Sequence, residues 1–166
     1  AKIIIVADSA KGLGLLAQAA AGNPFAKLTN LAVTGTNGKT TVTYLVRSII
    51  QAAHKKCALI GTVSCDSTDE ATEATMTTPP AIQIAEVAQK AVQAGADYMA
   101  IEASSHALDQ NRLAGVNFTA AAFTNLTGDH LDYHQTKENY LAAKTKLFTQ
   151  LPSHAMAILN ADSEES

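Results

Sequence analysis

Short runs of apolar residues recur along the chain, and they are rich in Val, Ile and Ala with little alternation of polar positions. Strands that are covered on both faces, as in a parallel sheet, have this pattern. The runs therefore predict buried strands, which we place at residues 3–7, 31–34, 58–63, 98–102, 120–125 and 155–160.

Amphipathic helical patterns lie between these runs, where apolar residues recur at steps of three and four. We expect helices at residues 42–53, 81–94 and 137–150. The second follows Pro79 and Pro80 and ends before Gly95, as is typical of a helix start and stop. The alternation of strands and helices predicts an α/β fold with right-handed crossovers, in which helices flank a mostly parallel sheet.

Two segments interrupt this alternation. Residues 66–76 carry Ser, Thr, Asp and Glu and are expected to form a mobile loop, and residues 22–30 are expected to contain a linker. We therefore divide the chain into residues 1–30, the tail of a preceding domain with its linker, and residues 31–166, an incomplete second domain. The chain starts at Ala1 rather than Met and ends without a closing element, so we expect a fragment of a longer protein.

Composition and charge exclude several classes of protein. The 166 residues suffice for one compact domain, and 47% hydrophobic with 16% charged residues is typical of a soluble globular protein. The net charge of -3 offers no basic surface for nucleic acid, and no apolar run reaches the ~20 residues that span a membrane. Cys57 and Cys65 are too few for a disulfide framework, so we expect free thiols in a cytoplasmic protein.

The clearest local motif lies in residues 31–41, where an apolar strand runs into a glycine-bearing turn, a Lys-Thr pair and an amphipathic helix. Gly35 and Gly38 would let backbone N–H groups close around phosphate oxygens, and the helix N-terminus adds partial positive charge. Lys39 can reach the β- and γ-phosphates of a nucleotide, and the Thr40 hydroxyl can ligate Mg²⁺. This order of strand, turn and helix indicates a nucleotide-binding loop.

Two glycine patterns depart from general motifs. The P-loop pattern G-x-x-x-x-G-K-[ST] has its first glycine where this chain has Val33, so the motif here is the tighter Gly35-x-x-Gly38-Lys-Thr. Upstream, residues 12–17 fit the dinucleotide-binding pattern G-x-G-x-x-A, but the next strand lacks the acidic residue that such a site needs. We therefore interpret residues 12–17 as the start of a helix.

Acidic and histidine side chains follow two of the predicted strands. Glu102 ends the strand at residues 98–102, and the carboxyl ends of parallel strands line the ligand crevice, so this carboxylate is expected beside the phosphate loop as a Mg²⁺ ligand. The alternative is a solvated charge or a helix cap. Residues 129–134 carry two Asp and two His at the same edge. They could ligate a metal or belong to a polar loop, and their spacing does not identify the metal.

Lys144 lies in the middle of an apolar stripe formed by Tyr140, Leu141, Leu147 and Phe148 of the third predicted helix. Burial would favour the neutral amine of this lysine. A neutral amine can react with CO₂ to give a carbamate, which is anionic and can ligate a metal. The alternative is a lysine whose charged end reaches out to water.

Together these motifs resemble the Mur ligases, and the MurE-type members in particular. The resemblance is carried by residues 34–41, 102–112, 123–134 and 140–144, in order and with similar spacing. It implies a P-loop-containing central ATP-binding domain at residues 31–166. It also implies that residues 1–30 are the tail of an N-terminal UDP-binding domain and that a C-terminal amino-acid-binding domain is missing from this sequence.

The resemblance implies roles for individual residues. The ATP-binding residues would be Gly35, Thr36, Asn37, Gly38, Lys39, Thr40 and Thr41. The Mg²⁺ ligands would be Thr40 and Glu102 for one ion, and His130 and carbamylated Lys144 for a second. The residues that contact the UDP-MurNAc-peptide would be Thr77, Thr78, Ser104, Gln110 and Arg112. The catalytic residues would be Lys39, His130 and Lys144.

The implied reaction is an ATP-dependent ligation in peptidoglycan synthesis, which adds L-lysine or meso-diaminopimelate to the UDP-MurNAc-dipeptide through an acyl phosphate. The partners would be this dipeptide, the amino acid and the missing domains, without which the fragment is not expected to complete ligation. Alternatives are a folylpolyglutamate synthase-like ligase of the same superfamily and a non-catalytic nucleotide-binding module, whose Mg-ATP binding would be indifferent to Lys144→Ala. A scaffold that binds no nucleotide is a further alternative.

Overall fold

A mixed sheet forms the centre of the molecule. The structure, a computed structural model, describes residue 3 and residues 5–166, and within them a seven-stranded sheet has the order β4-β3-β2-β5-β1-β6-β7. The strands are β1 (Thr29–Thr34), β2 (Cys57–Ile60), β3 (Ser64–Asp66), β4 (Ala71–Glu73), β5 (Tyr98–Glu102), β6 (Ala120–Phe123) and β7 (Met156–Leu159). Strands β2, β5, β1, β6 and β7 are parallel, and β3 and β4 extend the sheet in antiparallel fashion. The predicted α/β fold is confirmed.

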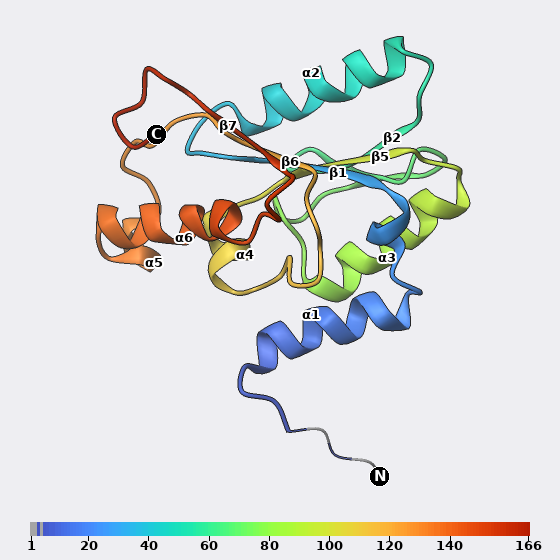
Figure 1. Cartoon of the computed structure of the whole chain (residues 1–166), viewed down its shortest axis with the longest axis horizontal. Coiled ribbons are helices and arrows are strands. Elements are labelled where there is room, and N and C mark those ends of the chain that lie inside the picture. Colours follow the sequence, from blue (N-terminus) through green and yellow to red (C-terminus); the bar gives the residue numbers. More distant parts are fainter. Residues whose placement is uncertain (1–2, 4) are drawn as a thin grey trace.

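Helices cover both faces of the sheet (Figure 1). They are α1 (Ser9–Ala20), the 3-10 helix η1 (Pro24–Lys27), α2 (Lys39–Ala52), α3 (Ala81–Gln93), α4 (Ser105–Asp109), α5 (Leu131–His134) and α6 (Lys137–Thr149). Helix α2 lies on one face, and α3, α4 and α6 lie on the other (Figure 1). In the part of the chain that the structure describes, no helix has the length and apolar character needed to cross a membrane.

Most of the continuous apolar runs become buried strands, but the run predicted as buried at residues 155–160 becomes the edge strand β7, whose four residues are exposed. All four residues of β2 are fully buried, and so are Met99 and Ile101 of β5. Ile84 and Ala88 of α3 pack in the same cluster. Both faces of these strands are covered, so neighbouring residues along the strand are buried alike, which is why their sequences show little alternation.

The predicted strand at residues 3–7 is wrong. Residue 4 lies outside the described residues, and the others form no strand; the side chains of Ile3 and Ile5 are 86% and 94% exposed. None of the strands among the described residues pairs with this segment, and an apolar run without a partner does not form a sheet. Helix α1 begins after Asp8, whose carboxylate accepts a hydrogen bond from the Lys11 backbone N–H at 2.9 Å.

The glycines of residues 12–17 lie inside α1, which confirms that this segment is helical.

The loop predicted at residues 66–76 is wrong in part, because it contains β4. A turn at Thr68, whose φ is 84°, joins β3 to β4, and its backbone N–H donates to the Asp66 carboxylate at 2.7 Å. All three residues of β4 are exposed, so no apolar pattern marks this strand in the sequence.

The segment predicted as a linker is attached to the sheet. Phe25 and Leu28 are buried in the main core, and β1 already begins at Thr29. Asn30 is 2% exposed, and its Nδ2 donates to the backbone oxygens of Phe25 at 2.8 Å and Asn117 at 2.9 Å. Helix α1 packs against α3. A domain boundary near residue 30 stays a prediction.

Replacing Asn30 by Ala should lower the free energy of unfolding by about 1–3 kcal/mol, because a buried and a partly buried carbonyl oxygen lose their donor. Urea denaturation of the two chains measures this difference. Lys27→Ala, at an exposed position of the same segment, should change the value by less than about 0.5 kcal/mol. Equal effects of the two substitutions would show that the Asn30 bridge contributes nothing.

Candidate functional site

The predicted phosphate loop connects β1 to α2. Gly35 has a φ of 139°, and Gly38, with a φ of 84°, is the residue that precedes the first turn of α2 at residues 39–41. A Cβ on Gly35 would collide with the Thr124 hydroxyl. Both glycines therefore adopt backbone conformations that L side chains disfavour, and the turn closes tightly in front of the helix N-terminus.

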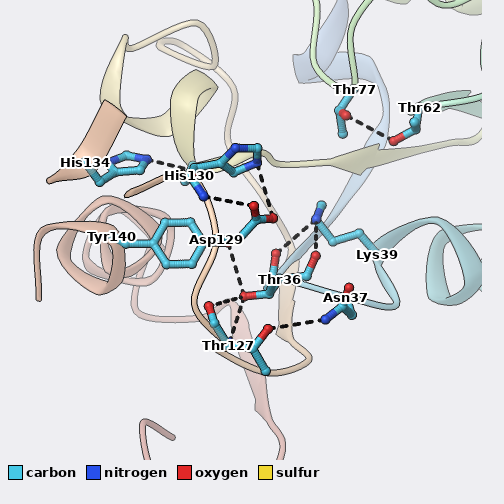
Figure 2. A network of polar contacts seen from close by, with 12 residues as sticks. Thr36, Asn37, Lys39, Thr62, Thr77, Thr127, Asp129, His130, His134 and Tyr140 are labelled. Atoms are coloured by element: carbon cyan, nitrogen blue, oxygen red, sulfur yellow. Dashed lines mark hydrogen bonds and ion pairs between the residues drawn. The ribbon is translucent and has the colours of Figure 1, made fainter. Parts of the chain in front are cut away.

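The segment after β6 holds this loop in place (Figure 2). The Thr36 and Asn37 backbone N–H groups donate to the backbone oxygen and the side-chain oxygen of Asn125 at 2.8 and 3.0 Å. The Thr124 hydroxyl donates to the Asn37 carbonyl at 2.7 Å, and the Asn37 side chain donates to Thr127 Oγ1 at 3.3 Å. The loop is thus fixed by a segment that lies far from it in the sequence.

Lys39 folds back over the loop. Its Nζ donates to the carbonyl oxygens of Gly35 at 3.0 Å and Thr36 at 2.9 Å (Figure 2). Burial lowers the pKa of Lys39, and the negative charges of Glu102 and Asp129 oppose this shift. The amine lies beside the turn, where a phosphate oxygen could replace a carbonyl as its acceptor.

Glu102 is fully buried at the end of β5. Its Oε2 accepts hydrogen bonds from Thr40 Oγ1 at 2.9 Å and Thr62 Oγ1 at 3.0 Å, and its Oε1 accepts from the Thr62 backbone N–H at 3.0 Å. A Cβ on Gly61 would collide with this carboxylate. The structure thus brings together Thr40 and Glu102, as the sequence predicts, in a space that needs glycine on the neighbouring strand end.

Lys144 is 1% exposed, which excludes the alternative of a lysine that reaches out to water. Its Nζ donates to the Gly35 carbonyl at 2.8 Å and lies 4.3 Å from the centroid of the Tyr140 ring. Burial, followed by the positive charge of Lys39, lowers the pKa of Lys144 to about 7, while Asp129 acts in the opposite direction. The amine is therefore buried next to the phosphate loop and readily neutral.

His130 lies in the connection between β6 and α6, with a φ of 53°. Its Nε2 is 3.6 Å from Asp129 Oδ2, and its ring centroid is 4.8 Å from that of His106 and 6.3 Å from that of Tyr140. His134, from the same predicted constellation, is buried and packs 5.3 Å from the Tyr140 ring. Across the described residues, no three His, Cys, Asp or Glu side chains come together as a metal cluster.

The residues predicted to contact the peptide substrate form one network next to Glu102. The Thr78 hydroxyl donates to the Glu102 backbone oxygen at 2.5 Å and accepts from the Ser104 backbone N–H at 3.0 Å. Arg112 Nη1 donates to the Thr78 backbone oxygen at 2.7 Å, and two further nitrogens of its guanidinium donate to the Gln110 side chain. Thr77, the remaining predicted contact, has its hydroxyl 3.1 Å from the Thr62 hydroxyl, whose single hydrogen is donated to Glu102.

Sequence reasoning assigned no site role to several residues that hold this site, among them Thr124 and Asn125. Thr62 bonds the buried carboxylate; it follows the end of β2, so its place at the crevice edge was the signal available. Thr127 and Tyr140 both contact the Thr36 hydroxyl, through a backbone N–H at 2.9 Å and the phenol at 3.2 Å. The Tyr140 ring also packs beside the Lys144 amine. Helical spacing identified Tyr140 as buried but could not assign it a polar partner.

A parallel strand, a glycine turn and a helix that begins with Lys39 and Thr40 define the class of this domain, an α/β fold with a phosphate-binding loop. The sequence profile of the Mur ligase middle domain matches residues 33–166. The chain therefore belongs to the Mur ligase middle-domain family.

Similar proteins include a UDP-N-acetylmuramoyl-L-alanyl-D-glutamate--2,6-diaminopimelate ligase of Parabacteroides distasonis, 46% identical over 160 residues that cover 96% of this chain and 33% of the relative. A solved structure of a ligase with that name has a TM-score of 0.79 at 34% identity, covering 97% of this chain and 33% of that one. Folylpolyglutamate synthase of Mycobacterium tuberculosis shares the fold, with a TM-score of 0.68 at 15% identity over 93% of this chain and 46% of that one. The chain spans about a third of the length of the curated relatives it matches.

The buried amine of Lys144 should make stability depend on pH. The pKa of Lys144 is about 7 in the fold, against 10.5 for an ordinary lysine, so the unfolded chain binds more protons between these values. The free energy of unfolding should therefore rise with pH in this window, by about 1 kcal/mol per pH unit relative to a Lys144→Met variant. Urea denaturation of both chains in CO₂-free buffer gives the free energy of unfolding at each pH. A constant difference between the two chains from about pH 7.5 to about pH 9.5 would contradict the prediction.

Proposed function

We propose that this chain is the ATP-binding segment of a MurE-type ligase, a cytoplasmic enzyme that adds the third amino acid to UDP-MurNAc-L-Ala-D-Glu. The observation that carries the proposal is the meeting of Lys39, Lys144 and the Thr40–Glu102 pair around one glycine turn. The names of the relatives that cover nearly the whole chain support the same reaction and favour 2,6-diaminopimelate as the amino acid added.

ATP would bind with its phosphates at the turn between β1 and α2. Mur ligases use ATP and Mg²⁺. The backbone N–H groups that begin α2 and the positive end of its dipole favour an anion at this position. Lys39 would exchange its two carbonyl acceptors for phosphate oxygens, and the Asn125 contacts would keep the loop in shape while it does so.

The Thr40–Glu102 pair fits a Mg²⁺ ion bound to the nucleotide. Both side chains offer oxygen ligands, which Mg²⁺ prefers. Glu102 is fully buried, and none of the direct ion pairs among the described residues includes it, so its charge is offset only by its hydrogen bonds and by the nearby Lys39. When bound, the ion would offset the negative charge that gathers as ATP and a carboxylate approach each other.

Lys144 would serve a second ion after reaction with CO₂. The neutral amine attacks the carbon, an N–C bond forms, one C=O electron pair moves to oxygen, and the nitrogen releases a proton to solvent. The product is an anionic carbamate with two oxygen ligands. His130 would contribute its imidazole to the same ion. This proposal is supported by the burial of Lys144, its pKa of about 7 and its place at the Gly35 carbonyl.

The network of Thr77, Thr78, Ser104, Gln110 and Arg112 would hold the UDP-linked peptide so that its terminal carboxylate faces the γ-phosphate. A carboxylate is a poor acyl donor, and phosphoryl transfer from ATP converts it into an acyl phosphate with ADP released. The amine of the incoming amino acid then displaces phosphate and forms the amide. The chain's own contribution is to orient the two anions and to lower their mutual repulsion.

The alternative ligase, a folylpolyglutamate synthase, is supported only by the shared fold, because the likeness rests on 15% identity. The 46% identity to the diaminopimelate ligase favours the muramoyl peptide as substrate.

Glu102→Gln keeps the side-chain size and removes the charge. In the full-length protein it should lower the Mg²⁺-dependent part of ATP affinity about tenfold, which corresponds to about 1.4 kcal/mol. Calorimetric titration with ATP, in magnesium and in EDTA, separates the two contributions. Glu86→Gln, at an exposed position of α3, is the control and should change neither. The same loss of affinity with and without magnesium would argue against a metal ligand.

The full-length protein should convert ATP, UDP-MurNAc-L-Ala-D-Glu and one amino acid into the amide, ADP and phosphate. The test is ADP release and product mass with 2,6-diaminopimelate, L-lysine and other amino acids, and in parallel with a folate and glutamate. Turnover with the folate alone would identify the folylpolyglutamate synthase-like alternative. ATP binding without turnover of any acceptor would indicate a nucleotide-binding module.

A further inference from the structure

The guanidinium of Arg112 is held on two sides. Its Nε and Nη2 donate to the same Gln110 Oε1 at 3.0 and 2.7 Å, and its Nη1 donates to the Thr78 backbone oxygen at 2.7 Å. Two bonds to one acceptor and one bond on the opposite edge fix the plane of the guanidinium. The side chain of Gln110 therefore helps to fix the orientation of the Arg112 guanidinium.

Gln110 is in turn held by a hydroxyl from α5. Its Nε2 donates to Tyr133 Oη at 3.3 Å, and this hydroxyl donates to Asp109 Oδ2 at 3.0 Å. The other oxygen of Asp109 accepts from Lys146 Nζ of α6 at 2.6 Å. A continuous path of hydrogen bonds thus runs from α6 to Arg112.

Only one assignment of donors and acceptors is possible along this path of hydrogen bonds. A carboxylate only accepts hydrogen bonds, so Asp109 requires the single hydrogen of the Tyr133 hydroxyl. The phenol oxygen can then only accept from its other neighbour, which must be the NH₂ end of the Gln110 amide. The carbonyl end of Gln110 is left facing Arg112, which has only donors. With the amide reversed, the NH₂ group would face the guanidinium and both bonds to Arg112 would be lost.

We propose that Asp109 and Tyr133 are positioning residues of the peptide-substrate site, because they fix the orientation of the Gln110 amide and through it the plane of Arg112. This inference rests on the function proposed above, in which Gln110 and Arg112 contact the UDP-linked peptide. Neither Asp109 nor Tyr133 needs to touch the substrate. Lys146 stabilises the charge of Asp109, and the pKa of this carboxyl is lowered chiefly by the Lys146 hydrogen bond.

The test is a double-mutant cycle in the full-length enzyme. Tyr133→Phe removes the hydroxyl and keeps the ring that packs 4.3 Å from His106. It should raise KM for UDP-MurNAc-L-Ala-D-Glu about fivefold, as expected for one lost hydrogen bond, and change KM for ATP and kcat by less than about twofold. Asp109→Asn should have a similar effect. If Tyr133 acts only through Gln110, the double variant Tyr133→Phe with Gln110→Ala should be no worse than Gln110→Ala alone.

Tyr44→Phe is the matched control, because it removes a hydroxyl that contacts Ser64 Oγ at 3.2 Å on the α2 side of the sheet. It should leave all three kinetic constants unchanged. An unchanged peptide KM in Tyr133→Phe, or additive effects in the cycle, would overturn the positioning role while wild-type activity upholds the proposed function. Absence of ligation by the wild-type enzyme with this substrate would overturn both.

Discussion

Two lysine side chains meet at one backbone oxygen, and much of the site depends on this contact. The Gly35 carbonyl accepts from Lys39 Nζ at 3.0 Å and from Lys144 Nζ at 2.8 Å. Two ammonium groups this close repel each other, and burial adds to the cost of the charge on Lys144. The pKa of Lys144 is therefore lowered to about 7, so part of this amine is neutral near pH 7, and a neutral amine reacts as a nucleophile where an ammonium group cannot. The reactivity proposed for Lys144 follows from its burial, to which the positive charge of Lys39 at the shared carbonyl adds.

The parallel sheet explains how residues distant in the sequence reach this place. The ends of β1, β2, β5 and β6 lie at one edge of the sheet, and each adds a different group: the glycine turn, Thr62, Glu102 and the segment that carries His130. Glu102 ends its strand, and the glycine turn and Thr62 lie within two residues of theirs, so the strand register largely determines the distances between these groups. The fold shared with folylpolyglutamate synthase at 15% identity is consistent with a scaffold that tolerates wide changes elsewhere.

The periodicity of apolar residues was sufficient to predict an element where burial follows a regular pattern along it. The central buried strands, the phosphate turn and the burial of Lys144 could be predicted, because each depends on spacing within one segment. The edge strand β7 was wrongly predicted as buried, because its apolar run does not show that no element covers it. Strand β4 could not, since its three residues are exposed, and residues 3–7 were misjudged because an apolar run does not reveal whether a partner strand is present. The Thr62 contact to Glu102 depends on β2 lying next to β5 in the sheet, and the sequence of neither strand predicts which strand is its neighbour.

Two of the three lysines of helix α6 bond different parts of the site: Lys144 bonds the phosphate turn, and Lys146 bonds the end of α4. Successive residues of a helix are turned by about 100°, so residues two apart point in nearly opposite directions. One residue inserted ahead of Lys144 would rotate both amines away from their partners together. Loops around this helix can change length during evolution, whereas α6 itself must keep its residue count between Lys137 and Lys146.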